Sequence, residues 1–368
     1  MEETFQILSC TPVALTVFGM GPFQEKPFTL DFTNQKGDAC NFFLIISPNG
    51  RGKTTLLEAM ASLMQLLDFN RTADPPHKRL WSNPKAWAQL DLLVVRKEGK
   101  ISNFFITLSA GHKDLENNLK MGDHYFYIVW SNYLGCWHLD YNRCQQSLLD
   151  SVQIEMKNVY KTFGLNAINA PSLLYFDAHR DIPMITDQGQ SPSIPPELFY
   201  RPLHHFGLHG DQWQHSLDNL LVWLTWLDDG RYEKAQEMIN RFVFSGTGKV
   251  LDRVNRQHMH AVITSGGTQH RLDQLSSGEK SLMQLMLRIH LHLTNHSIVV
   301  IDELDAHLHP KLQHRLYQAL KSLIAENPGL TLVATTHSLE LIDQFGIDMK
   351  VEEPGLRLGG HLIDKEDI

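Results

Sequence analysis

The chain has 368 residues, 42% of them apolar and 20% charged, and a formal net charge of −8. This is a globular composition, long enough for one large domain or a domain with an insertion. The acidic balance argues against a surface coated in basic groups, although it leaves room for a local basic groove. The four cysteines lack CxxC spacing, no apolar run approaches the ~18 residues of a membrane span, and the acidic start has no signal-peptide pattern. We expect a cytoplasmic protein with no membrane partner.

The first 140 residues are expected to form a β-rich lobe with one glycine-rich loop. Strand-like patterns occur at 4–18, 28–32, 87–95, 101–108 and 124–130, and the last three look antiparallel. The apolar run Phe42–Ile46 indicates a buried strand, and from Leu56 to Leu67 apolar residues recur at helical spacing.

Between that strand and that helix lies the segment Ser-Pro-Asn-Gly-Arg-Gly-Lys-Thr, residues 47–54. Backbone N–H groups of such a loop, with the dipole of the next helix, bind phosphates. The lysine can reach the β- and γ-phosphates, and the threonine hydroxyl can ligate Mg²⁺. Ser47 stands where the usual pattern has its first glycine, so the match is short by one position. The candidate nucleotide-binding residues are Asn49, Gly50, Gly52, Lys53, Thr54 and Thr55, with Thr54 also a metal ligand.

Residues 141–270 are expected to form a helical or lid-like insertion. Their pattern predicts mixed helical structure at 141–170, a buried strand at 172–176, a proline-rich loop at 189–202, helices near 216–227 and 231–243, and a β-region up to Gln274. Residues 271–368 then alternate: a helix from about Ser281, a strand at 298–302, a helix at 310–326, a strand at 330–336, a helix at 338–345 and a strand-like 355–363. This alternation predicts a mostly parallel sheet.

Two adjacent carboxylates, Asp302 and Glu303, end the apolar strand that starts at Ile298. A charge at the edge of an apolar strand is costly unless something positive meets it. Mg²⁺ is the natural partner of Asp302, and Glu303 is then placed to orient or deprotonate an attacking water. The alternative is a pair of caps for the following helix.

Two further segments carry candidate phosphate contacts. In Leu-Ser-Ser-Gly-Glu-Lys, residues 275–280, the Ser276 hydroxyl and the N–H groups of Ser277 and Gly278 can bind anionic oxygens at a helix N-terminus. A simple capping box headed by Ser277 is the competing interpretation, but it would place Lys280 at the acidic position. His337 follows the strand 330–336 and can hydrogen-bond a phosphate or the water; otherwise it is an ordinary loop residue.

Together these segments resemble the head of an ABC-type ATPase of the SMC/RecF/OLD-like branch, and most closely the anti-phage defence ATPases. In this resemblance residues 47–54 are the Walker A loop, residues 275–280 the signature loop, and residues 298–303 the Walker B strand. The D-loop falls at 306–309, where histidine replaces the usual aspartate, and His337 is the switch histidine. Residues 175–180, Tyr-Phe-Asp-Ala-His-Arg, are also similar to a segment of that subgroup. The position of the Q-loop is left open, with Gln89 as a weak candidate.

The resemblance implies an α/β P-loop NTPase: a single ABC-ATPase head over 1–368, with a mixed sheet, an antiparallel β-subdomain and a helical insertion. Its lobes are 1–140, 141–270 and 271–368. It implies ATP and Mg²⁺ as ligands, Glu303 and His337 as catalytic residues, and a homodimer closed around ATP. It further implies a separate effector such as a nuclease or toxin, because no second catalytic cluster is recognisable. Two alternatives stay open: a nucleotide-gated scaffold or sensor with little turnover that restrains an effector, and a RecF-like DNA-repair clamp that binds DNA.

Overall fold

The computed structural model describes residues 6–68, 77–98, 100–112, 124–131, 136–139, 170–182, 191–207, 212–364 and 366–367. At its centre is a six-stranded sheet in which every neighbouring pair is parallel. Its strand order is β15 (Leu358–Leu362), β3 (Phe42–Ile46), β14 (Thr331–Thr336), β13 (His296–Ile301), β8 (Pro171–Phe176) and β9 (Leu203–Phe206). The predicted parallel sheet is confirmed. Two of its strands, β8 and β9, come from the range expected to form an insertion.

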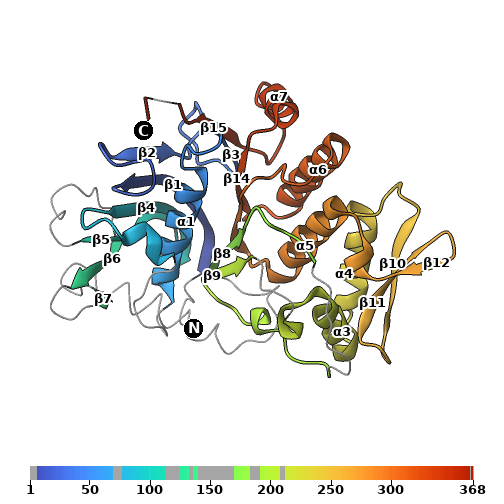
Figure 1. Ribbon diagram of the computed structural model, residues 1–368. Coiled ribbons are helices and arrows are strands. Elements are labelled where there is room, and N and C mark those ends of the chain that lie inside the picture. Colours follow the sequence, from blue (N-terminus) through green and yellow to red (C-terminus); the bar gives the residue numbers. More distant parts are fainter. Residues whose placement is uncertain are drawn as a thin grey trace.

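The two faces of the central sheet pack against different layers, as their alternating side chains require. Val299 and Ile301 of β13 face a core shared with five helices, whereas Ile298 and Val300 face a core shared with α1 (Lys53–Met64) and the β-subdomain. Figure 1 shows these layers on either side of the sheet. The helices of the first core are α3 (Leu217–Leu227), α4 (Arg231–Phe242), α5 (Ser277–His292), α6 (Pro310–Glu326) and α7 (Leu339–Asp348).

The β-subdomain is a second six-stranded sheet, with the order β2 (Phe28–Asp31), β1 (Gln6–Phe18), β4 (Trp87–Glu98), β5 (Lys100–His112), β6 (His124–Ser131) and β7 (Cys136–Leu139). The expectation that β4, β5 and β6 are all antiparallel is only half right, because β5 and β6 run parallel. A three-stranded antiparallel sheet of β10 (Lys249–Asn255), β11 (His260–Ser265) and β12 (Thr268–His270) packs on α3 and α4.

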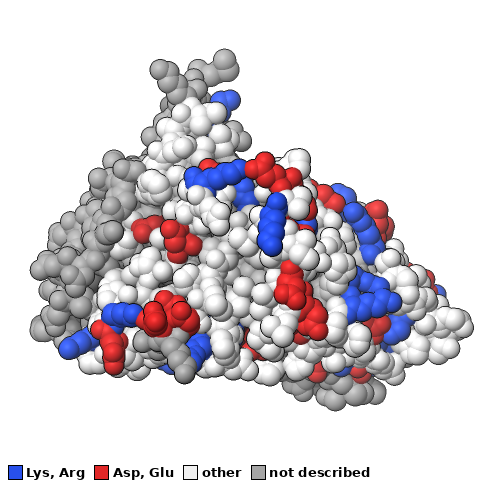
Figure 2. All heavy atoms as spheres, turned by 90° about the horizontal axis from the view of Figure 1, so that it is seen from above, with Lys and Arg blue, Asp and Glu red and all other residues white. Residues whose placement is uncertain are grey.

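Short 3-10 turns complete the described structure: η1 (Gln65–Leu67), η2 (Lys78–Trp81), η6 (Pro196–Leu198), η7 (Trp213–His215) and η8 (Leu272–Gln274). Helices near 216–227, 231–243 and 310–326 are confirmed, whereas the helical structure expected at 141–170 lies almost entirely outside the described residues. None of the described helices is long and apolar enough to cross a bilayer. On the face shown in Figure 2, the acidic and basic side chains of the described residues lie in mixed clusters, and no continuous basic patch is visible among them.

Candidate nucleotide-binding site

The glycine-rich loop joins β3 to α1, as its sequence context predicts. Gly50 and Gly52 have φ angles of 79° and 88°, in the left-handed region that glycine adopts without strain. Gly52 also lies close to the β-subdomain, because a Cβ there would come within 2.6 Å of the Phe23 ring and 2.7 Å of Pro22. Substitution of Gly52 would therefore displace the start of α1, where the first N–H groups are free for an anion.

Lys53, the first residue of α1, folds back over the loop. Its Nζ donates to the carbonyl oxygens of Ser47 at 2.6 Å and Pro48 at 3.2 Å. Burial lowers the pKa of Lys53, and the charges of Glu303 and Asp302 partly offset that effect. The ammonium thus lies inside the loop and electrostatically close to both carboxylates.

Asp302 lies directly beyond β13 and is held by two hydroxyl groups. Thr54 Oγ1 donates to Asp302 Oδ2 at 2.7 Å, and Thr335 Oγ1 donates to Asp302 Oδ1 at 2.7 Å. Asp302 and Thr335 are almost fully buried. The sheet therefore brings together Thr54 and Asp302, the two residues predicted as Mg²⁺ ligands. A hydroxyl and a carboxylate oxygen in contact form a hard oxygen donor set of the kind Mg²⁺ prefers.

Glu303 has a backbone conformation that is unusual for its residue type. Its φ angle is 47°, in the left-handed region that non-glycine residues seldom adopt. Its N–H donates to Thr335 Oγ1 at 2.7 Å, and the N–H of Leu304 donates to the Thr335 carbonyl at 2.8 Å. The side-chain hydroxyl and the main-chain carbonyl of Thr335, in β14, thus hold this turn at Glu303 and Leu304. Strained backbone of this kind is common at functional sites.

His337 lies one residue beyond β14 and contacts the segment that follows Glu303. Its Nδ1 is 3.1 Å from Asp305 Oδ2, and its N–H donates to Asp305 Oδ1 at 3.3 Å. Thr336 Oγ1 donates to the same carboxylate oxygen. Asp305 is buried, whereas the His337 side chain is 47% exposed. The buried carboxylate therefore orients an imidazole whose other face is open to solvent. Asp305 was not expected as a site residue.

The signature loop caps α5, but the helix begins at Ser277, four residues earlier than expected. Its N-cap is Ser276, not Ser277: the Ser276 N–H and Oγ donate to Glu279 Oε2 at 3.0 and 2.7 Å. The capping box therefore has Glu279 at its acidic position, so Lys280 creates no mismatch. Lys249 donates to both oxygens of Glu279 at 2.8 and 2.9 Å. Burial alone would raise the pKa of Glu279, but these hydrogen bonds outweigh it and the pKa lies below its ordinary value.

Gly278 gives this loop a close contact with the D-loop segment. A Cβ at Gly278 would lie 2.8 Å from Leu312 Cδ1 and 3.4 Å from the His307 carbonyl oxygen. His307 itself has a φ angle of 61°. The signature loop and the D-loop segment thus pack against each other. By contrast, the amide of Gln89 lies in β4, where it donates to Asp91 at 3.0 Å, so the structure places this Q-loop candidate within the β-subdomain.

Polar side chains beside the Walker residues form a further cluster. His205 Nε2 and Asp177 Oδ1 are 2.8 Å apart, and the rings of His205 and His77 have centroids 5.2 Å apart. Arg79 donates to Glu58 of α1, whose pKa is raised by burial. Burial and the nearby His205 lower the pKa of His77 to about 4, so this histidine is neutral at pH 7. Nothing in the sequence pattern alone joined these residues, because they come from four separate segments.

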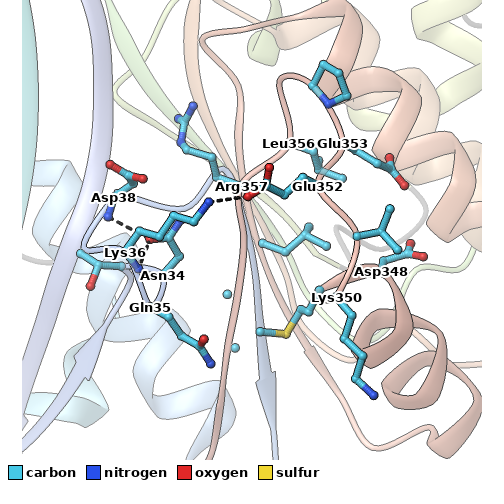
Figure 3. A pocket seen from close by; sticks show the side chains of 18 residues that line it. Asn34, Gln35, Lys36, Asp38, Asp348, Lys350, Glu352, Glu353, Leu356 and Arg357 are labelled. Carbon is cyan, nitrogen blue, oxygen red and sulfur yellow. Dashed lines mark hydrogen bonds and ion pairs between the residues drawn. The ribbon is translucent and has the colours of Figure 1, made fainter.

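The motif residues lie away from the large pocket shown in Figure 3. That pocket has a volume of about 1040 Å³ and lies between residues 33–38 and 346–360. The Arg357 carbonyl accepts from Asn41 and Phe42 there, so the pocket lies at the amino end of β3, opposite the glycine-rich loop. Its charges are mixed, and Lys36 pairs with Glu352 at 2.5 Å. The motif residues, not this pocket, are the candidate nucleotide-binding site.

Parts of the chain are similar to known proteins. The family described as "AAA domain, putative AbiEii toxin, Type IV TA system" matches residues 190–343, which include the signature loop and Walker B strand but not the Walker A loop. The Retron Vc95 probable ATPase of Vibrio cholerae serotype O1 biovar El Tor is 31% identical over 114 residues, or 28% of this chain and 21% of that protein. The phosphonates import ATP-binding protein PhnC of Lactobacillus acidophilus is 36% identical over 76 residues, or 21% of this chain and 28% of that protein.

The chain thus spans less than a third of the length of either relative. Among solved structures, the dimeric bacterial ABC transporter cassette MJ0796 is 13% identical in sequence, and the alignment covers 92% of this chain and 90% of the MJ0796 chain. Its TM-score of 0.30 is too low to establish a shared fold. The glycine-rich loop after β3, the carboxylates after β13 and the matched AAA segment fit an α/β P-loop protein that is related to ATPases.

Proposed function

We propose that this protein binds ATP with Mg²⁺ at the glycine-rich loop and hydrolyses it. The observation that carries this proposal is the 2.7 Å contact between Thr54 Oγ1 and Asp302 Oδ2, made by residues 248 positions apart in sequence. This contact joins the end of the phosphate loop to the Walker B carboxylate. Mg²⁺, once bound by these oxygens, would neutralise charge on the phosphates.

Each neighbouring residue has a defined role in this proposal. The Lys53 ammonium gives up its hydrogen bonds to the carbonyl oxygens of Ser47 and Pro48 and binds phosphate oxygens instead. It is placed for this exchange because it already lies within the loop. Glu303, next to the metal-binding carboxylate, accepts a proton from the attacking water. His337, oriented by Asp305, donates a hydrogen bond to the phosphate or the water.

The proposed active unit is a homodimer. The glycine-rich loop begins α1 and the signature loop begins α5, and these helices cover opposite faces of the central sheet. Within one chain the Ser276 N–H and hydroxyl donate to Glu279 of the same helix, and the proposed dimer requires the hydroxyl to turn from Glu279 to a phosphate held by the partner. A second copy, packed head to tail, would bring its Ser276, Ser277 and Gly278 to each phosphate.

The proposed biological role is a defence-linked switch that acts through a separate effector. The AbiEii-type description of the matched family and the retron relative support this role. Trp226 on α3 has 64% of its surface exposed, and exposed aromatic residues are typical of protein interfaces. Metal-dependent cleavage of DNA or RNA by the pure protein, abolished by replacing carboxylates outside the ATP site, would contradict the separate effector.

The primary test is phosphate release from the wild type and from Glu303→Gln. We expect the variant to bind ATP normally and to lose hydrolysis by ~10²–10⁴-fold, the usual effect of removing a general base. Glu237→Gln, an exposed carboxylate on α4, is the matched control and should keep wild-type turnover. An active Glu303→Gln protein would exclude Glu303 as the base. A wild type that binds ATP without turnover would favour the nucleotide-gated sensor instead.

A further inference from the structure

Arg180 is a buried cation beside the Walker B turn. Only 5% of its surface is exposed, and it makes four hydrogen bonds. Nη1 donates to the carbonyl oxygens of Asp177 at 2.8 Å and Asp302 at 2.7 Å, and Nη2 donates to the Glu303 carbonyl at 2.7 Å. Nε donates to the Ser281 hydroxyl of α5 at 3.0 Å. A guanidinium has five N–H donors in a rigid fork, so this arrangement uses most of them.

The position of Arg180 explains why three of its four partners are main-chain oxygens. It follows β8, which pairs with β13, so its side chain reaches the point where β13 ends. Burial lowers the pKa of Arg180 to about 10, which still leaves it protonated at neutral pH. A buried charge needs strong acceptors, and the carbonyls of residues 302 and 303 supply them.

These contacts fix the peptide groups next to the strained residue. Glu303, with its φ of 47°, has its N–H bonded to Thr335 and its carbonyl bonded to Arg180. Without the guanidinium, the carbonyl would be free to rotate, and the turn could relax toward the ordinary right-handed region. The Glu303 carboxylate would then leave the place set for it beside Asp302.

The fourth contact joins this turn to the signature helix. Ser281 lies four residues after Ser277, so both lie on the same face of α5. A displacement of the α5 N-terminus would therefore move Ser281 Oγ, and with it Arg180 and the carbonyls of residues 302 and 303. This route is made of direct contacts within one chain.

We propose that Arg180 is a positioning residue that sets the main-chain geometry of Asp302 and Glu303 and couples it to the signature helix through Ser281. This inference rests on the proposed function, because the signature loop contacts a nucleotide only in the dimer. A phosphate bound by the partner at Ser276–Gly278 is thereby sensed by the carboxylates of this chain's own site.

The test compares Arg180→Lys with Arg288→Lys. Arg288 is the matched control: it is also buried and lies on α5, and it donates to the His215 carbonyl at 2.6 Å and to Gln284 Oε1 at 3.0 Å, neither of which is a motif residue. Lysine keeps the charge at residue 180 but cannot reach four acceptors at once. We expect Arg180→Lys to lower kcat on the order of 10²-fold, as small misplacements of reacting groups do. Its ATP affinity, measured by nucleotide titration, should stay at the wild-type value, and Arg288→Lys should keep wild-type kcat.

Ser281→Ala tests the coupling alone, since it removes one acceptor and leaves the three carbonyl contacts in place. We expect this variant to retain most of kcat and to lose the cooperative dependence of hydrolysis on ATP concentration. Equal kcat for Arg180→Lys and Arg288→Lys would overturn the positioning role, as would a parallel loss of ATP affinity and thermal stability. A wild type that hydrolyses ATP without cooperativity, or a Ser281→Ala variant as cooperative as the wild type, would overturn the coupling. If the wild type hydrolyses ATP, any of these results refutes this inference and leaves the proposed function standing. If the wild type does not hydrolyse ATP, the proposed function is refuted together with this inference.

Discussion

Thr335 links the two Walker B residues through a single hydroxyl group. Its Oγ1 donates to Asp302 Oδ1 and accepts from the Glu303 N–H, both at 2.7 Å, and the residue is fully buried. Thr335→Val replaces this hydroxyl with a methyl group of nearly the same shape. It therefore removes both hydrogen bonds without opening a cavity.

The expected cost follows from the two bonds. A hydrogen bond to a charged group contributes about 1.5–3 kcal/mol, and a buried N–H left unsatisfied costs about 1–3 kcal/mol. The added methyl group returns about 0.8 kcal/mol of apolar burial. The net loss of folding free energy is thus about 2–5 kcal/mol. Because Glu303 also loses the partner that holds its left-handed backbone, kcat should fall on the order of 10²-fold.

Thr335→Ser is the matched control, because it keeps the hydroxyl and loses only the methyl group. Thermal unfolding followed by circular dichroism and steady-state phosphate release would be measured on both variants. We expect Thr335→Ser to remain close to wild type in turnover and Thr335→Val to lose both stability and turnover. If the two variants hydrolyse ATP at the same rate, the hydroxyl does not position the carboxylates and the reasoning is wrong.

Three further predictions concern single residues. Lys53→Ala should abolish ATP binding in a titration, since Lys53 and Arg51 are the only side-chain cations of the loop; undiminished affinity would exclude the loop as the binding site. Ser276→Arg should bind ATP but not hydrolyse it. Mixing Ser276→Arg chains with Lys53→Ala chains should restore at most one working site per dimer. Full activity of Ser276→Arg alone, or an active monomer by light scattering, would contradict a shared site. Burial lowers the pKa of His77 to about 4, so between pH 6.5 and pH 4 the unfolded chain binds more protons than the folded chain. The free energy of unfolding should therefore fall by roughly 3 kcal/mol over that range. His77→Gln should flatten that part of the thermal-midpoint profile, and an unchanged profile would refute the assignment.

The sequence predicts the parts of this site that are contiguous in the chain. The strand before Ser47, the helix after Lys53 and the strand before Asp302 all follow from local apolar periodicity. The start of α5 was expected near Ser281 but lies at Ser277, because Ser276 caps the helix and pairs with Glu279. The local signal was present in this case, as the Ser-x-x-Glu spacing of residues 276–279.

Other features could not be predicted, because they depend on which strands become neighbours. The contact of Thr335 with Asp302 requires β14 to lie beside β13, and the contact of Arg180 requires β8 on the other side. The spacing of residues within one segment carries no information on either strand pairing. The parallel pairing of β5 with β6 was missed for the same reason, since strand direction is not encoded in alternation.

The register of the central sheet therefore determines the chemistry of the site. In that sheet β3, β14, β13 and β8 are consecutive neighbours, and each ends at a segment of the proposed site: the glycine-rich loop, Thr335 to His337, Asp302, and Asp177 to Arg180. Ligands of open parallel sheets bind beyond the carboxyl ends of the strands, where these segments meet. Ile301 is paired with Ala334 and with Phe176, so a shift of one residue in either pair would turn every side chain of a strand to the opposite face. The two cores, which take alternate residues of β13, exclude that shift. Packing on both faces of the sheet thus places Asp302 within reach of Thr54, and the geometry of the proposed site depends on buried residues outside the motifs.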